Sequence, residues 1–404
     1  MNLQLPSTIY YISFARLLLA FGYTMSYVFV PVYLSDVKKL PPSLVGLITG
    51  ISSLLGLVSW FFVNFFSEKL GEKKMILVSF SIRTLVFLLS GIFIYFDFSY
   101  FYLILLLFAN SFLLGLSVSP MEALIIANTN EDNRNLAFSI HRTGMNLGWA
   151  LGPLLGGFLA DYNYSFPFFG TFFLTLISMV LLNRWLKNEI RIQKSDSLKD
   201  NFKNFFQNRI LVFFLLNSIN IFIVMSLLIT PLSVFLTNQH NITKVNLGKL
   251  YFLNGIMIVL FQVPVSLWTK NLFFSIQIGT LFYYLGFLSI GIFSYFSLKH
   301  SFFYLSIVII SIGELLTISS LHSLISLVAE KTNKNISSRS LNIFVSSYIG
   351  FTRTLGWSVG PVFAGWIQEF FNGQPLWIWF FSPITGLLGI GIHMYLGRKV
   401  KDFF

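Results

Sequence analysis

The chain contains no cysteine and few charged residues, and both shortages narrow its class. Without cysteine, disulfides and thiolate metal sites are excluded. Only 10% of the 404 residues are charged and 55% are hydrophobic, whereas about a quarter of the residues of a soluble domain are charged. Common enzyme motifs, such as Gly-x-Ser-x-Gly, His-Glu-x-x-His and a phosphate loop, are also missing. The sequence therefore predicts an integral membrane protein that is no enzyme and needs no cofactor or metal.

Long apolar runs recur along the whole chain. Each is close to the roughly 20 residues that a membrane-spanning helix requires. The first run begins directly at the N-terminus, so no cleavable signal peptide and no separate soluble domain are expected. The pattern predicts an all-α protein with twelve transmembrane helices, at residues 8–34, 42–66, 75–96, 99–127, 136–160, 165–186, 209–236, 246–269, 272–296, 301–329, 340–368 and 375–397.

The net charge of +12 comes from basic residues that are unevenly distributed between the loops. With both termini placed in the cytoplasm, most of the 27 Lys and Arg residues fall on the inner side. Positive residues mark the cytoplasmic side of membrane proteins. The sequence thus predicts a multi-pass protein of the cell membrane, in contact with lipid, with both termini inside. The excess charge is an orientation signal, and no nucleic-acid partner is expected.

Two phrases of the sequence occur twice. Gly-Trp-Ala-Leu-Gly-Pro at Gly148–Pro153 returns as Gly-Trp-Ser-Val-Gly-Pro at Gly356–Pro361. Met-Ser followed by Pro at Met25–Pro31 returns at Met225–Pro231. The common order of the matches indicates an internal duplication, which is frequent in membrane transporters.

The duplication predicts two pseudo-symmetric six-helix bundles, at residues 1–186 and 209–404. The polar segment 187–208 between them is expected to be a cytoplasmic linker. It is either a solvated connection or, from its Phe residues among Lys and Asn, a helix on the inner membrane surface.

On these features the chain resembles the major facilitator superfamily. The loop Asn64–Lys74 is similar to that family's Gly-x-x-x-Asp-x-x-Gly-Arg-Arg/Lys-Lys. The resemblance implies that Glu68, Gly71 and Lys73 form a latch between helices in one access state. The other interpretation is an ordinary short charged turn.

The fifth predicted span is similar to a glycine pattern of that family's antiporters and exporters. Glycines four residues apart let a neighbouring helix approach closely, and proline permits a bend. We expect helix packing at Gly144, Gly148, Gly152, Pro153, Gly156 and Gly157, and in the eleventh span at Gly356, Gly360 and Pro361. The family's drug–proton antiporters also carry an arginine in the fourth span, where this chain has Ser111.

Ionisable residues within the spans are the candidates for a solute or coupling site, because a charge in the bilayer is costly and is usually paired or faces a wet cavity. Arg16, Tyr23 and Tyr27 share one face of the first span. A cation beside two phenols suits an anionic or aromatic solute, unless Arg16 is held in a structural pair. Arg83 of the third span is expected to be structural.

The fourth and fifth spans supply Glu122, Arg142 and Asn146. Glu122 either accepts a proton, if burial raises its pKa, or pairs with Arg142 and holds two helices together. Arg142 and Asn146 share a helix face.

The second half supplies Asn217, Glu314, His322 and Arg353. Glu314 lies near the middle of the tenth span and is the candidate for proton coupling. His322 is an interhelical hydrogen bonder or part of the site, and Arg353 is a possible partner of Glu314. Asn217 is polar enough to contact a solute.

Together these features predict a secondary active transporter that acts as a monomer. It moves a small organic solute across the cell membrane by alternating access, coupled to protons, with export favoured over uptake. The alternatives are a proton-coupled uptake permease and a non-transporting membrane receptor or assembly protein.

Overall fold

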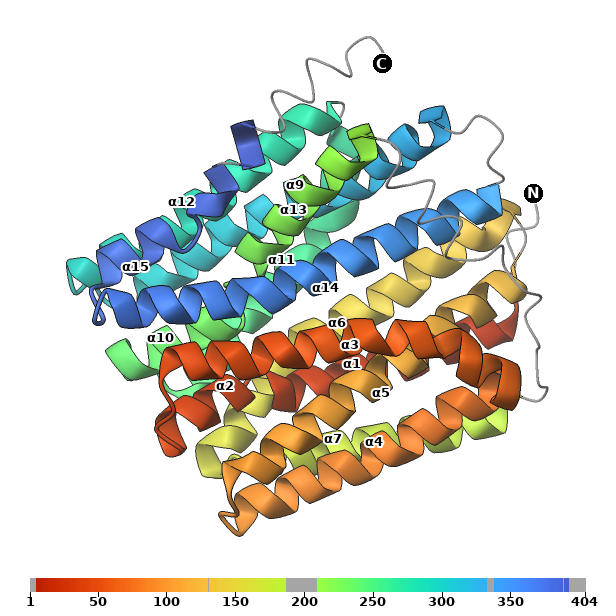
Figure 1. Ribbon diagram of the computed structural model, residues 1–404, viewed down its shortest axis with the longest axis horizontal. Helices are drawn as coiled ribbons and strands as arrows, with labels where there is room; N and C mark the ends of the chain where they lie inside the picture. The colour runs from red at the N-terminus through yellow and green to blue at the C-terminus, as the bar shows by residue number, and fades with distance from the viewer. Residues whose placement is uncertain are drawn as a thin grey trace. The chain divides into compact units, whose positions relative to one another are not determined.

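The computed structural model describes residues 5–129, 131–186, 209–269, 271–332, 338–387 and 389–391. The predicted linker 187–208 lies outside these residues. The helices, labelled in Figure 1, are α1 (Ser7–Tyr27), α2 (Val30–Val32), the π-helix η1 (Tyr33–Val37), α3 (Pro42–Leu70), α4 (Glu72–Tyr95), α5 (Tyr100–Ala127), α6 (Glu131–Tyr162), α7 (Phe166–Trp185), α9 (Arg209–Ser226), α10 (Thr230–His240), α11 (Lys244–Trp268), α12 (Leu272–Tyr295), α13 (Ser301–Thr332), α14 (Ser338–Phe370) and α15 (Pro375–Phe381).

The described helices account for each of the predicted spans. Among the residues that the structure describes, nine segments are long and apolar enough to cross a membrane. The three further predicted spans correspond to α6, α14 and the short apolar stretch Pro375–Gly391. Helices α6 and α14 both carry Arg and Asn among their apolar residues, and α6 also carries His, which lowers their hydropathy. These polar residues make α6 and α14 candidates for functional helices.

The chain forms two compact units. Unit 1 comprises Met1–Leu40, Ile51–Gln193 and Ser233–Val259, and unit 2 comprises Pro41–Gly50, Lys194–Leu232 and Leu260–Phe404. Helices α3 and α11 are each divided between the units. The first turns of α3 therefore pack with helices of the second half of the sequence, and the first turns of α11 with helices of the first half.

The first and seventh predicted spans are each interrupted, which corrects the prediction of two continuous helices. One interruption precedes Pro31 and the other precedes Pro231. Proline has no N–H to donate to the preceding turn. At each break the backbone forms a tight turn. The N–H of Phe29 donates to the carbonyl oxygen of Ser26 at 3.1 Å, and the N–H of Ile229 donates to that of Ser226 at 3.3 Å. The repeated phrase thus produces the same break twice.

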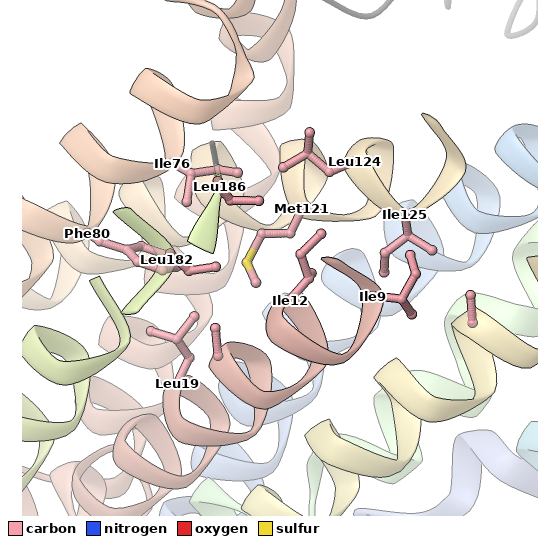
Figure 2. Close-up of a cluster of buried hydrophobic side chains, with 12 residues drawn as sticks. Ile9, Ile12, Leu19, Ile76, Phe80, Met121, Leu124, Ile125, Leu182 and Leu186 are labelled. Atoms are coloured by element: carbon pink, nitrogen blue, oxygen red, sulfur yellow. The ribbon is translucent and has the colours of Figure 1, made fainter. Parts of the chain in front are cut away.

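Unit 1 has a core of aliphatic side chains at one end of its helices. Figure 2 shows Ile12 of α1 beside Met121 of α5, with Leu182 of α7 and Phe80 of α4 on the other side. These side chains are buried. Within this unit α1 packs along α6 and α7, and α4 packs along α5 and α7. The core fixes α1, α4, α5 and α7 relative to one another, and α1 and α4 hold the site residues described next.

Unit 2 has a corresponding core around α9, α12, α13 and α14. Its buried members include Phe222, Ile276, Leu321 and Ile349. Helix α13 packs along α12, and α14 packs along α9. This packing fixes α13, on which the candidate coupling acid lies.

Candidate functional site

The aromatic face of α1 is the first part of the candidate site. The rings of Tyr23 and Tyr27, one helical turn apart, stack with centroids 4.7 Å apart and planes 19° apart. Trp149 of α6 meets Tyr23 edge-on at 6.4 Å. Tyr27 is buried, whereas Tyr23 is partly exposed. The face combines ring surface with a phenol group that can donate or accept.

Arg16 lies two turns before Tyr23 on the same face of α1. Its side chain is partly exposed. The Nη2 atom donates to the thioether sulfur of Met145 in α6 at 3.3 Å, and thioether sulfur is a weak acceptor. Arg16 also interacts electrostatically with His141 of α6, which is buried. Arg16, Tyr23 and Tyr27 thus lie along one side of α1 in unit 1, and a solute site there stays a prediction.

A second arginine, which the sequence led us to regard as structural, joins this neighbourhood. Arg83 of α4 is 1% exposed, and its Nε donates to Oδ1 of Asn110 in α5 at 3.0 Å. The guanidinium interacts electrostatically with Tyr23 and Arg16. Asn110 directly precedes Ser111, where the family resemblance would place an arginine. The sequence did show Arg83 as a charged residue within an apolar span. The direction in which its side chain points, however, depends on how α4 packs.

Four glycines of α6 bring this helix into backbone contact with α1. A Cβ atom added at Gly148 would lie 2.7 Å from the carbonyl oxygen of Leu17 and from the backbone nitrogen of Phe21. The hydroxyl of Thr24 donates to the carbonyl oxygen of Gly148 at 3.2 Å. The other members of this ladder, Gly144, Gly152 and Gly156, also face α1. The contact sets the position of Arg16 and Tyr23 relative to Trp149.

Other faces of α6 meet the beginning of α11 in unit 1. A Cβ atom at Gly248 would overlap the carbonyl oxygen of Pro153, and one at Gly157 would overlap that of Lys244. The backbone N–H of Lys244 donates to the carboxylate of Asp161 at 3.2 Å. The first turn of α11 is thus capped by an acid at the end of α6.

Unit 2 repeats this arrangement with α14 and the beginning of α3. A Cβ atom at Gly46 would overlap the carbonyl oxygen of Pro361. The backbone N–H of Ser43 donates to the carboxylate of Glu369 at 3.0 Å, and the hydroxyl of Ser358 donates to the carbonyl oxygen of Gly50 at 2.7 Å. Gly356 and Gly360 face α9, as the ladder of α6 faces α1.

The candidate coupling acid lies within unit 2. Glu314 is near the middle of α13 and is partly exposed. It interacts electrostatically with the buried Tyr283 of α12. A Cβ atom at Gly313 would lie 2.8 Å from both the carbonyl oxygen of Gly279 and the backbone nitrogen of Tyr283. The close approach of α12 at this turn holds the backbone of Glu314 in place.

Asn217 of α9 is buried beside Asn220. A Cβ atom at Gly389 would lie 2.9 Å from the side-chain oxygen of Asn217 and would overlap the side-chain nitrogen of Asn220. The side chains of Asn217 and Asn220 therefore lie near the same point. The Asn220 amide donates to the carbonyl oxygen of Thr385, and the nearby Ser218 hydroxyl lies 3.4 Å from that of Tyr348. This is a second polar cluster in unit 2.

The other candidates are spread over several helices. Glu122 of α5, Asn146 of α6 and His322 of α13 are partly exposed, whereas Arg142 of α6 and Arg353 of α14 are exposed. Pairing of Glu122 with Arg142, and of Glu314 with Arg353, stays a prediction. Among the described residues there is no group of three or more His, Asp or Glu that could hold a metal ion.

The loop with the predicted latch connects α3 and α4. Gly71 has a φ of 75° and directly precedes α4, a conformation that glycine adopts without strain. Lys73 is partly exposed. Glu72, which the motif did not assign, is buried in the first turn of α4 and accepts a hydrogen bond from the Ser67 hydroxyl at 2.9 Å. An acid is favourable at a helix N-terminus. Glu72 is therefore an additional candidate for the acid of the predicted latch.

Duplicated helical units with polar side chains inside apolar helices are typical of multi-pass membrane transporters. The sequence profile of the Major Facilitator Superfamily matches residues 12–361. The chain belongs to this family, which confirms the predicted resemblance, the twelve-helix fold class and a transporter rather than an enzyme.

Two of the relatives match shorter stretches of the sequence. The chain is 30% identical over 145 residues to the uncharacterized MFS-type transporter YqjV of Bacillus subtilis, covering 36% of this chain and 34% of that protein. It is 29% identical over 161 residues to the proton-coupled antiporter flippase LtaA of Staphylococcus saprophyticus, covering 38% and 37%. The chain thus aligns with about a third of the length of these relatives.

A solved structure matches over nearly the full chain. A POT family transporter in complex with 5-aminolevulinic acid aligns with a TM-score of 0.79 at 13% identity, covering 97% of this chain and 95% of that one. At this identity the likeness shows the fold alone.

Proposed function

We propose that this transporter moves a small organic solute by alternating access, couples the movement to protons and works in the direction of export. The observation that supports coupling most directly is the place of Glu314. An ionisable residue in the middle of a membrane helix costs at least about 2.5 kcal/mol on insertion scales, so it is usually functional. Tyr283 of α12 interacts electrostatically with this carboxyl, and α12 approaches α13 closely at the neighbouring Gly313.

The solute-binding part of the proposal rests on unit 1. The partly exposed Arg16 and Tyr23 share one face of α1, and Tyr27 and Trp149 complete an aromatic surface. Such a face suits a solute with a flat apolar part and a polar group. Asn146 and Asn217 are proposed as further contacts, and Glu122, Arg142, His322 and Arg353 as parts of the coupling machinery.

Export is favoured by one relative. LtaA is named a proton-coupled antiporter flippase, and its matched stretch covers 38% of this chain. For the same reason the coupling ion is proposed to be the proton.

The membrane orientation and the division into halves are also proposed. The distribution of Lys and Arg supports cytoplasmic termini, and the paired breaks at Pro31 and Pro231 support halves at 1–186 and 209–404, joined by 187–208. We propose that the protein acts as a monomer, with Glu68, Gly71 and Lys73 as the latch.

The test is transport by purified protein reconstituted in liposomes with an imposed pH gradient. A panel of labelled aromatic acids, aromatic amines and sugars supplies the solutes. We expect at least one solute to move against its gradient when a proton gradient is imposed. In Glu314→Gln the proton-driven accumulation is lost, while exchange of labelled for unlabelled solute persists, because an amide cannot carry a proton.

The matched control is Asp97→Asn, the same change at an acid that is 79% exposed outside the spans. It should leave proton-driven accumulation unchanged. Flux that ignores both the pH gradient and Glu314→Gln would refute proton coupling, and failure of every solute to move would favour the receptor alternative.

A further inference from the structure

Arg83 is a buried cation whose direct contacts, Asn110 and Phe87, are neutral. Its Nε donates to Asn110, and its guanidinium carbon lies 5.7 Å from the ring centroid of Phe87. Within the part of the chain that the structure describes, Nη1 is buried and has no hydrogen-bond partner, and no carboxylate lies within ion-pair distance of Arg83. Buried arginines are almost always paired with acids, so this one is set apart by its surroundings.

The orientation of the guanidinium is fixed by Asn110. An arginine has five N–H donors in a planar fork. The amide oxygen of Asn110 takes the Nε donor, and the edge that includes Nη1 is left available. That edge is the geometry with which arginine binds a carboxylate or a phosphate.

The neighbours of Arg83 add positive potential and aromatic surface. Arg16 of α1 is close enough to interact electrostatically, and the two like charges repel. Tyr23, which stacks on Tyr27, also interacts with Arg83. Two like charges near each other repel strongly in a medium of low polarity, so binding of an anion at Arg83 would be favoured by both cations.

We propose that Arg83 binds the anionic group of the transported solute, a carboxylate or a phosphate, through Nη1. Arg16 adds a second positive charge at the partly exposed edge of the site, and Tyr23 and Tyr27 contact an aromatic or flat apolar part of the same solute. The inference rests on the proposed function and names its substrate class, an organic anion. It also gives Asn110 a role as the residue that positions Arg83.

The first test measures binding to the full-length purified transporter by the shift in its thermal unfolding temperature. Benzoate and phenyl phosphate are the anionic probes, and benzamide is the neutral probe of similar shape. We expect the anions to raise the unfolding temperature and benzamide to leave it unchanged. Arg83→Gln should weaken anion binding about tenfold or more, because it removes charge-assisted hydrogen bonds. Equal shifts with benzamide, or an unchanged response in Arg83→Gln, would overturn the proposal.

Two further variants make the result independent of the folding of Arg83→Gln. Asn110→Asp places a carboxylate at the position that now accepts from Nε at 3.0 Å, so it should neutralise the charge of Arg83 and abolish the anion response in a folded protein. Arg184→Gln, the same change as Arg83→Gln at an exposed arginine near the end of α7, should bind anions as the unmodified protein does. Retention of anion binding in Asn110→Asp would contradict the inference.

The source of the anion is distinguished by lipid. Nanodiscs of phosphatidylcholine with and without phosphatidylglycerol replace the soluble probes. Arg83-dependent stabilisation by phosphatidylglycerol alone supports the same site with a lipid headgroup as its ligand, and no stabilisation by either class of anion refutes it. Arg83-dependent binding without any flux would refute transport and leave the site standing. Proton-driven flux of a cationic or neutral solute without anion binding would refute the anion site and leave the proposed transport standing.

Discussion

The backbone contact between α1 and α6 predicts that Gly148 tolerates no side chain. In Gly148→Ala the new methyl group would lie 2.7 Å from the Leu17 carbonyl oxygen and the Phe21 nitrogen, and 2.8 Å from Ala20 Cβ. Favourable contacts require about 3.5–4.0 Å, so the helices must separate by about 1 Å along this stretch. Two of the three obstacles are backbone atoms and cannot move aside as a flexible side chain would.

The expected magnitude follows from two opposing effects. Overpacking costs about 1–3 kcal/mol, and replacing glycine by alanine in a helix recovers up to about 1 kcal/mol. Because two of the obstacles are backbone atoms, we take an overpacking cost of about 2–3 kcal/mol, and after the recovery of about 1 kcal/mol the net loss in the free energy of unfolding is about 1–2 kcal/mol. At about 2–4 °C per kcal/mol for a unit of this size, the unfolding temperature should fall by about 2–8 °C.

The assay is thermal unfolding of the detergent-purified protein, with Gly56→Ala as the matched control. A Cβ atom at Gly56 of α3 has its nearest neighbour, the Ser111 carbonyl oxygen, at 3.5 Å, which is an ordinary contact. Gly56→Ala should therefore be neutral or slightly stabilising. If Gly148→Ala unfolds at the same temperature as Gly56→Ala, the reasoning from the α1–α6 contact is wrong.

Two further predictions concern individual polar contacts. Ser358→Ala removes the hydrogen bond to the Gly50 carbonyl oxygen and should cost about 0.5–1.5 kcal/mol, measured as a lower unfolding temperature; an unchanged temperature would show that this bond adds nothing. The Lys38–Asp97 ion pair should stabilise the protein only while Lys38 is charged. Burial lowers the pKa of Lys38, but the hydrogen bond to Asp97 and the nearby Tyr33 and Asp97 raise it more, so that pKa lies above its ordinary value. A raised folded-state pKa contributes stability that is present below the unfolded pKa of about 10.4 and is lost as the pH rises through the folded value. The difference in unfolding temperature between the unmodified protein and Asp97→Asn should therefore shrink above about pH 10.4, and a constant difference would contradict this account.

The acid caps at the starts of α3 and α11 show how the duplication survives in three dimensions. Asp161 caps Lys244 in unit 1, and Glu369 caps Ser43 in unit 2. Both acids lie at the ends of repeat-related helices. A carboxylate at a helix N-terminus satisfies an otherwise unpaired N–H and is favoured by the helix dipole. The two acids are eight residues past Pro153 and Pro361, at equivalent places after the repeated phrase.

The sequence by itself determined the fold class of this protein. Apolar runs of membrane length leave the backbone no alternative to helices, because unpaired N–H and C=O groups are too costly in lipid. The repeated phrases at Gly148–Pro153 and Gly356–Pro361 identified the doubling and the helices that pack closely. Such features depend on residues near one another in the chain, so they can be read without a structure.

The breaks at Pro31 and Pro231 were present in the sequence as prolines, but their effect was not evident from hydropathy. A long apolar run reads as one span whether its helix is continuous or interrupted. The hydrogen bonds that the carbonyl oxygens of Ser26 and Ser226 accept at these breaks appear only in the structure.

The tertiary structure alone decided which charges meet. Arg83 reads as a residue that extends toward the membrane surface, yet α4 packs so that its guanidinium reaches Asn110 and lies near Tyr23. Side-chain direction depends on the rotation of each helix about its axis. That rotation is set by contacts between residues distant in sequence, such as Gly148 against Leu17, so spacing along a single helix cannot predict it.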